Sequence, residues 1–213
     1  MITISNQNLT IKIDESLGGE IQQIEFDGDP LLAFDDWHAP VKSSRSRTYG
    51  DEKLDWLSEY RGGWQLLVPN AGAACVIDNL PLPFHGEWSR TKVDIVHTSP
   101  SEVSMQAGTR LPFVVRRTIR VCNDPARVQI TTTVTNIAES PYPFVWGEHP
   151  AFLASPGDQI DMPPGDVLDA ADELHRTTTW PDGPLGDSRL DRVPSVRPTE
   201  SVHFLPDRSS GWV

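Results

Sequence analysis

Short stretches in which apolar and polar residues alternate recur along this chain. The alternation has the two-residue period of a β-strand, in which successive side chains point to opposite faces. Several stretches are also rich in Val, Ile and Thr, the β-branched residues that favour strands. The pattern predicts strands at residues 9–13, 21–26, 91–96, 102–107, 112–121 and 128–135.

Turn residues separate these predicted strands. Gly18 and Gly19 precede the second strand, a turn around 98–100 joins the next pair, and a short link at 122–126 joins the last pair as a hairpin. Short strands at this spacing, with turn chemistry between them, indicate a sandwich or a barrel. We therefore predict an all-β protein.

Helices have little room, because proline and glycine are frequent. The chain holds 19 prolines and 15 glycines, and a proline inside a helix costs about 3 kcal/mol. Residues 166–176 have the one helical pattern, which fits a short helix and an irregular strand equally well, and residues 56–63 read as a polar loop. We find no repeat and no linker, so a single domain over residues 1–213 is expected.

Charge and composition narrow the function. The 213 residues carry 18 Lys and Arg against 30 Asp and Glu, a formal net charge of −12. This balance argues against anionic partners, so we expect no nucleic acid and no membrane surface among them. No apolar run approaches the roughly 20 residues that span a bilayer, and the first residues lack the pattern of a secretory signal. Cys75 and Cys122 have no metal-site spacing and make no disulfide framework, so a cytoplasmic location is expected.

Candidate chemistry gathers in two compact motifs. The first combines Arg61, followed by two glycines, with His85, followed by another glycine, and with Arg90. The second is Gly-Glu-His-Pro-Ala-Phe at 147–152, around His149. Glycine or proline beside each histidine puts the imidazole at a strand end or turn, where backbone and ligand can approach closely. Imidazole transfers protons near neutral pH, whereas motifs of phosphate loops, serine hydrolases and zinc proteases are missing from the sequence.

These motifs, in this order, resemble the aldose 1-epimerase (galactose mutarotase-like) superfamily, and within it most the hexose-6-phosphate mutarotase-type branch. The Gly-Gly-x-Ile-x-x-Ile-x-x-Asp-Gly pattern of residues 18–28 is similar to the opening hairpin of that superfamily, and the resemblance extends over roughly residues 8–175. It implies a large antiparallel β-sandwich, the galactose mutarotase-like supersandwich, which binds a carbohydrate on a concave face. The implied reaction interconverts the α and β anomers of a hexose or hexose phosphate, with no metal and no organic cofactor.

The resemblance also implies roles for individual residues. His149 is the acid that protonates the ring oxygen, and His85 hydrogen-bonds the sugar near the same atom. Guanidinium groups suit hydroxyls, or a phosphate if the substrate carries one, and indole rings offer flat faces for a sugar. The expected substrate-binding residues are Arg61, Arg90, Trp64 and Trp88.

The general base of the superfamily is a glutamate late in the chain, and no matching segment is present before Val213. We expect either a C-terminally truncated chain or a diverged sequence in which another carboxylate serves. Glu148 would point to the face opposite His149 in a strand, while Glu87 lies two residues from His85. An absent base also leaves open a non-catalytic carbohydrate-binding protein with the same fold. A metal site on the two histidines is a weaker interpretation, because no third ligand lies at a recognised spacing, and a homo-oligomer stays open.

Overall fold

The computed structural model describes residues 1–35, 50–169, 177–182, 189–193, 195 and 202–206. The chain divides into two compact units, Met1–Leu153 and Ala154–Val213. The expected single domain over residues 1–213 stays a prediction.

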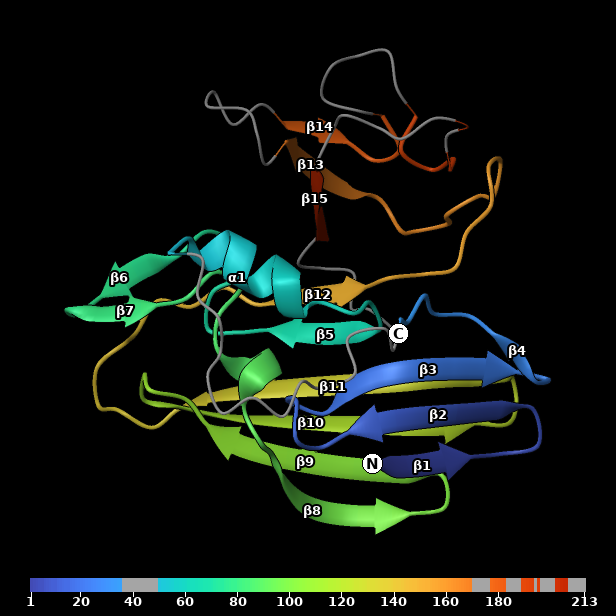
Figure 1. Ribbon diagram of the computed structural model, residues 1–213, viewed down its shortest axis with the longest axis horizontal. Helices are drawn as coiled ribbons and strands as arrows, with labels where there is room; N and C mark the ends of the chain where they lie inside the picture. The colour runs from blue at the N-terminus through green and yellow to red at the C-terminus, as the bar shows by residue number, and fades with distance from the viewer. Residues whose placement is uncertain (36–49, 170–176, 183–188, 194, 196–201, 207–213) are drawn as a thin grey trace. The chain divides into compact units, whose positions relative to one another are not determined.

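Two antiparallel sheets build most of the first unit (Figure 1). The first sheet consists of β1 (Ile2–Ser5), β2 (Leu9–Asp14), β3 (Glu20–Phe26), β5 (Trp64–Leu67) and β12 (Gly147–Pro150), in that order, with β4 (Asp29–Pro30) paired to β3. The second sheet consists of β11 (Arg127–Asn136), β10 (Phe113–Cys122), β9 (Glu102–Gly108) and β8 (Asp94–Ser99), in that order. A two-stranded sheet joins β6 (Cys75–Ile77) to β7 (Leu80–Leu82). The prediction of an all-β protein is confirmed.

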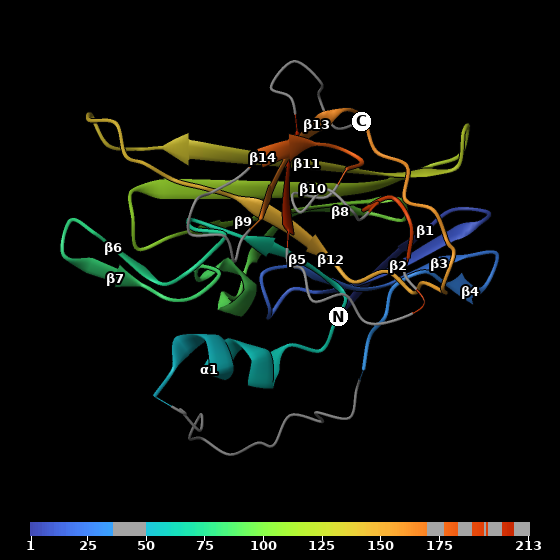
Figure 2. The same ribbon diagram turned by 90° about the horizontal axis from the view of Figure 1, so that it is seen from above.

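The two large sheets face each other across one hydrophobic core. Figure 2 shows the second sheet and the first sheet as successive layers, with helix α1 (Glu52–Glu59) beyond the first sheet. Core side chains come from both sheets, among them Ile11 and Leu66 from the first and Val115 and Ile119 from the second. Removing this apolar surface from water, at about 25 cal/mol per Å², is what holds the sheets together.

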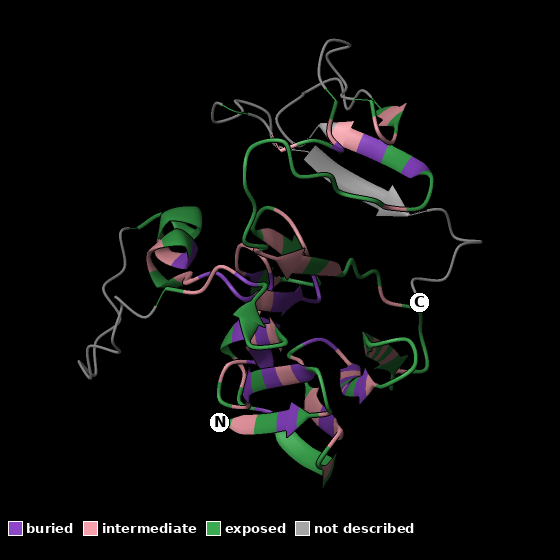
Figure 3. Cartoon of the chain, turned by 90° about the vertical axis from the view of Figure 1, so that its right-hand side faces the viewer, coloured by how far each residue is buried: buried purple, intermediate pink, exposed green. Residues whose placement is uncertain are grey.

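Strand β10 shows why the alternating sequence forms this sheet. Its residues alternate between buried and more exposed along the whole strand, and Val115, Ile119 and Val121 belong to the core. Buried and more exposed residues also alternate along other strands of the chain (Figure 3). β10 pairs antiparallel with β11 along its full length, so the predicted hairpin is confirmed. The other predicted strands are present too, although the strand expected at 91–96 begins only at Asp94.

Helix α1 corrects the prediction of a polar loop at 56–63. Asp51 caps the helix, because its carboxylate accepts a hydrogen bond from the backbone N of Leu54 at 2.9 Å. Trp56 is buried at 5% exposure. A helix this short is marginal in isolation, so the packing of Trp56 stabilises it. The loop prediction is wrong for residues 56–59 because that packing cannot be read from local sequence.

A three-stranded antiparallel sheet forms the described core of the second unit. Its central strand is β13 (Gly165–Asp169), flanked by β14 (Thr177–Thr179) and β15 (Val202–Pro206). Of the two alternatives for residues 166–176, the strand is present up to Asp169, and residues 170–176 lie outside the described part of the chain.

Two chain-wide features complete the description. Neither Cys75 nor Cys122 is in a disulfide. In the part of the chain that the structure describes, every helix is too short or too polar to cross a bilayer.

Candidate functional site

His149 lies on the face of the first sheet that is turned away from the core, called the outer face here. β12 pairs antiparallel with β5, and His149 is directly opposite Gln65. Cross-strand partners point to the same side of a sheet, so the two side chains share the outer face. The next pair, Glu148 and Leu66, points to the core side. Glu148 and His149 thus lie on opposite faces, as expected.

His85 belongs to the loop between β7 and the short 3-10 helix η1 (Trp88–Arg90). Its φ of +62° lies in the left-handed region that residues with a side chain seldom adopt. Gly86 follows at φ +73°, and a Cβ there would lie 2.4 Å from the carbonyl O of Val68. A conformation of this kind costs on the order of 1 kcal/mol or more and persists only where the surroundings impose it. The loop therefore fixes the imidazole in place.

The two histidines meet in an aromatic cluster formed by Trp56, Tyr60, Phe84, His85 and His149. The imidazole centroids are 5.7 Å apart, and both histidines are half-buried. Trp56 contacts both rings, with centroid distances of 4.6 Å to His85 and 5.4 Å to His149. Tyr60 stacks on Trp56 at 4.6 Å and meets His149 at 5.1 Å. The fold therefore brings together two imidazoles that lie far apart in the sequence.

A small cavity adjoins the aromatic cluster and shares Trp56 and Tyr60 with it. Arg61 and Arg90 line this cavity, and the Arg90 Nε lies 3.0 Å from the carboxylate of Glu59. The cavity measures about 50 Å³, whereas sites for small molecules typically measure roughly 300 Å³ or more. In this conformation the cavity bordered by Trp56 and Tyr60 is too small for a typical small-molecule ligand.

Helix α1 is fastened over the outer face near both of its ends. The backbone N of Phe84 donates to Glu52 Oε2 at 3.1 Å, and Glu59 pairs with Arg90. Exposed ion pairs of this kind contribute about 1 kcal/mol or less. These polar contacts therefore add little to the packing of Trp56, which is the main contact between the helix and the loop that carries His85.

Glu20, the first residue of β3, lies in the cavity wall and was missed by the sequence analysis. It is only 3% exposed, and Gln65 Nε2 donates to its Oε1 at 2.8 Å. Burial raises the pKa of the Glu20 carboxyl, while the hydrogen bond from Gln65 and the charge of Arg61 oppose that rise. Burial, and after it the charge of Glu20, raises the pKa of Tyr60 to about 12. Gln65, the one polar residue in the apolar segment 64–68, was an available signal, whereas Glu20 begins a strand that also contains Gln22, Gln23 and Glu25 and so does not stand out.

The two predicted indole platforms do not reach the outer face. Trp64 points to the opposite side of β5, where its Nε1 donates to Glu148 Oε2 at 2.7 Å. Trp88 is fully buried and donates to the carbonyl O of Gly18 at 2.7 Å. Helix α1 supplies the aromatic rings near the histidines instead. The structure thus gathers four of the six expected site residues, the two histidines and the two arginines.

Neither carboxylate weighed as a replacement base reaches the histidines. Glu148 accepts hydrogen bonds from both terminal nitrogens of Arg117, each at 2.9 Å, on the core side of the sheet. Glu87 accepts from the backbone N of Arg110 at 2.6 Å and forms an ion pair with its guanidinium. Both groups are engaged in holding the fold.

A metal site on the two histidines would need a further ligand beside them. Within the described ranges, three or more His, Cys, Asp or Glu side chains do not converge anywhere in a group that could hold a metal ion. His85 and His149 therefore lack a described third ligand beside them.

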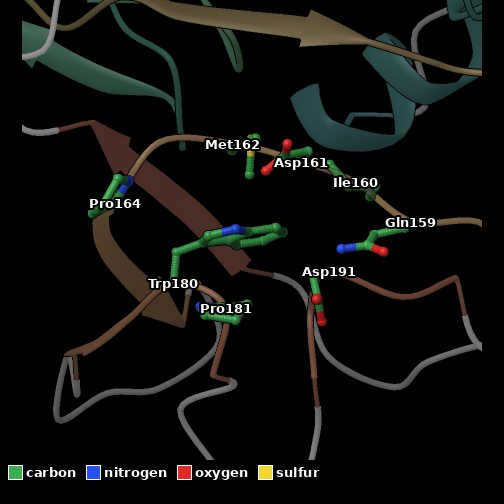
Figure 4. A pocket seen from close by; sticks show the side chains of 8 residues that line it. All are labelled: Gln159, Ile160, Asp161, Met162, Pro164, Trp180, Pro181 and Asp191. Atoms are coloured by element: carbon green, nitrogen blue, oxygen red, sulfur yellow. The ribbon is translucent and has the colours of Figure 1, made fainter.

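A larger hollow of about 260 Å³ lies in the second unit (Figure 4). Trp180, Asp161 and Asp191 are among its lining residues, and Asp191 is held by Arg189 at 2.7 Å. Of the described residues that line it, none is a histidine or an arginine. The candidate site for acid–base chemistry is therefore the outer face of the first sheet.

Comparison with known proteins identifies the fold. No protein-family model and no curated protein matches the chain. A solved structure of the galactose mutarotase related enzyme from Lactobacillus acidophilus matches with a TM-score of 0.61 at 15% identity, over 92% of this chain and 65% of that one. The Slr1438 protein from Synechocystis sp. PCC 6803 gives 0.60 at 16% identity, over 89% and 65%. A galactose mutarotase-like protein from Lactobacillus casei ATCC 334 gives 0.52 at 16% identity, over 96% and 67%.

At these identities the likeness shows the fold. The chain has the galactose mutarotase-like fold, so the predicted sandwich is confirmed. This chain spans about two thirds of the length of these structures. The hexose-6-phosphate branch is not singled out by them and stays a prediction.

Proposed function

We propose that this protein is an isomerase of the aldose 1-epimerase type, which interconverts the α and β anomers of a hexose. The observation that carries the proposal is the meeting of His85 and His149, 5.7 Å apart, on the outer face of a sheet. Imidazole is the side chain best suited to proton transfer near neutral pH. A galactose mutarotase related enzyme has the same fold.

The proposed reaction needs two proton transfers and no cofactor. His149 donates a proton to the ring oxygen as the C1–O5 bond breaks, and a base removes the proton of the anomeric hydroxyl as C1=O1 forms. Rotation about C1–C2 and ring closure give the other anomer. His85 hydrogen-bonds the sugar near O5, and Arg61 and Arg90 hold its hydroxyls.

Sugar binding also requires helix α1 to shift. Trp56 contacts both imidazoles and, with Tyr60, borders a cavity of only about 50 Å³. The contacts of Glu52 and Glu59 that fasten the helix are exposed and individually weak. Binding energy from a hexose can therefore displace the helix.

The test is the rate of anomer exchange of glucose and galactose, measured by saturation-transfer NMR. Wild-type protein is expected to accelerate exchange over buffer, and His149→Gln to lose about a hundredfold or more of the rate, the usual effect of a general acid. His97→Gln, on exposed strand β8, is the matched control and keeps full activity. A broad panel of sugars with no acceleration contradicts the proposal.

A second candidate is a non-catalytic carbohydrate-binding protein. The engagement of Glu87 and Glu148 elsewhere favours it, since neither of these carboxylates is then available as a base beside the histidines. Calorimetry separates the two candidates: sugar binding that weakens in Arg61→Ala, with no anomer exchange in the wild type, supports the binding protein. A cytoplasmic location and a homo-oligomer stay predictions in either case.

A further inference from the structure

We infer that Glu20 is the general base of this site, the carboxylate that removes the proton of the anomeric hydroxyl. The inference rests on the proposed function and assigns to a residue at the start of β3 the role expected of a late glutamate. The inference is supported by the position of Glu20 on the outer face and by the hydrogen bonding of its two carboxylate oxygens.

Glu20, Gln65 and His149 form a row across three neighbouring strands. Ile21 pairs with Trp64, so the preceding Glu20 and the following Gln65 are the next pair on the outer face. Gln65 is in turn opposite His149. Neighbouring strands lie about 4.8 Å apart, so the backbones of Glu20 and His149 are separated by about 10 Å. A pyranose lying over Gln65 would have the carboxylate on one side and the imidazole on the other.

Two buried acceptor atoms lie in the wall of the cavity without a donor. Oε1 of Glu20 accepts from Gln65, but Oε2 is buried and makes no hydrogen bond of full geometry to a described residue, although the Gln22 side chain lies close enough to stabilise the carboxylate. Oε1 of Gln65 is in the same state. An unpartnered buried polar atom costs roughly 1–3 kcal/mol, so such atoms call for an explanation. Sugar hydroxyls are donors, and they would satisfy both acceptors.

Neighbouring charges leave Glu20 able to gain and lose a proton. Burial raises its pKa, Asp14 adds to the rise, and Arg61 and the hydrogen bond from Gln65 oppose it. A raised pKa brings a carboxylate nearer to neutral pH, where a general base is most effective. The titratable and charged groups that face Glu20 or share its cavity are Asp14 on β2, Glu59 on α1, Tyr60 and Arg61 after α1, and Arg90 on η1.

The proton transfers balance without a cofactor. The Glu20 carboxylate takes the O1 proton, the C1–O5 bond breaks as C1=O1 forms, and the imidazolium of His149 gives its proton to O5. After rotation about C1–C2, the O5 hydroxyl attacks C1. His149 then takes back the O5 proton and Glu20 returns one to O1, which restores both groups.

The test compares Glu20→Gln with Glu25→Gln, a control on the same strand whose carboxylate pairs with Lys12. Glutamine keeps the size of Glu20 and its hydrogen bond to Gln65, and it removes the base. We expect kcat for anomer exchange to fall about a hundredfold or more, KM to stay within about threefold, and the acidic limb of the pH profile to disappear. Glu25→Gln keeps the wild-type kcat and the wild-type pH profile.

The outcomes separate this inference from the proposed function. An active wild type with a Glu20→Gln variant that keeps more than a tenth of kcat overturns the assignment of Glu20 alone. A wild type without turnover on any hexose overturns both. Glu20→Asp distinguishes loss of the base from misfolding, because it keeps a carboxylate in a shifted position. A kcat between those of the wild type and Glu20→Gln supports a proton-transfer role. A kcat as low as that of Glu20→Gln counts against this role.

Discussion

A carboxyl buried as deeply as Glu20 costs stability whenever it is ionised, since little water solvates its charge. Its raised pKa means that the folded protein holds this proton to a higher pH than the unfolded chain, where glutamate titrates near about 4.3. Stability therefore falls as the pH rises from that value through the folded pKa. A buried carboxyl that lowers the stability of the fold when ionised is more easily explained by a role in proton transfer than by a role in packing.

Replacing Glu20 by glutamine is expected to remove this loss. Near pH 4, where Glu20 is protonated in the folded state and largely protonated in the unfolded state, Glu20→Gln and the wild type should have similar free energies of unfolding. Above the folded pKa, the variant should be the more stable, by about 1.4 kcal/mol for each tenfold change in the acidity constant. Urea denaturation between pH 4 and pH 8 measures the difference, and a difference that is constant over this range contradicts the raised pKa.

At the scale of secondary-structure elements, strand β12 is held in place by the side chain next to its histidine. Glu148 accepts two hydrogen bonds from Arg117, which is 1% exposed, and a third from Trp64. The core side of β12 thereby fixes which side chain is presented on the outer face. The position of His149 therefore depends on an ion pair on the opposite face of the sheet.

Glu148→Ala should therefore destabilise the protein by about 3 kcal/mol, because it leaves the buried Arg117 without a counter-charge. The value is at the low end for such pairs because the Glu148 side chain is 31% exposed. Urea denaturation measures the loss, with the exposed Glu139→Ala as control. Changing both partners to methionine should cost less than Glu148→Ala alone, and an equal or greater cost would argue against an uncompensated charge as the cause.

Under the proposed function, helix α1 covers the site that a sugar must enter. Breaking the pair between Glu59 and Arg90 with Glu59→Gln removes up to about 1 kcal/mol from the closed arrangement. The apparent affinity for hexose should then rise by up to about fivefold, since less binding energy is spent on opening the site. Calorimetry measures the affinity, and Lys53→Gln, exposed on the same helix, is the control. Unchanged or weaker binding in Glu59→Gln would show that α1 is not a barrier.

At the scale of the whole molecule, features of short range were predictable from sequence. Strands β10 and β11 follow from alternation and from one short turn, because both faces of a hairpin are encoded in adjacent residues. Helix α1 was not predictable, since the packing of Trp56 against rings from distant segments stabilises it. The fold class followed from many such local patterns taken together.

The candidate site could be predicted only in part, for a related reason. The residues of the motifs, His85 and His149, do come together. Trp64 and Trp88 carry the same chemical signal as a sugar-binding indole, but the strand register and the core direct them elsewhere. Glu20 carries no local signal that separates it from a surface glutamate, and only its pairing with Gln65 across strands reveals it.

Charge over the whole protein and within the site bears on which sugar is preferred. The protein carries a formal net charge of −12. Within the cavity, the carboxyls of Glu20 and Glu59 accompany the guanidinium groups of Arg61 and Arg90, so no excess of positive charge is present among the described lining residues. A dianionic phosphate would meet repulsion from the protein and no surplus of cations at the site. These charges favour a neutral hexose as substrate over the hexose phosphate that the resemblance to the hexose-6-phosphate mutarotase-type branch implies.

We therefore expect kcat/KM for glucose or galactose to exceed that for glucose 6-phosphate. The ratio should grow as salt is lowered, because the screening length rises from about 10 Å at 0.1 M to about 30 Å at 0.01 M and the repulsion then reaches further. The neutral sugars themselves should show little dependence on salt, which makes them the internal control. Measuring anomer exchange for all three substrates at both ionic strengths tests this expectation: faster turnover of the phosphate at low salt would mean that Arg90 is released from Glu59 and forms an anion site with Arg61.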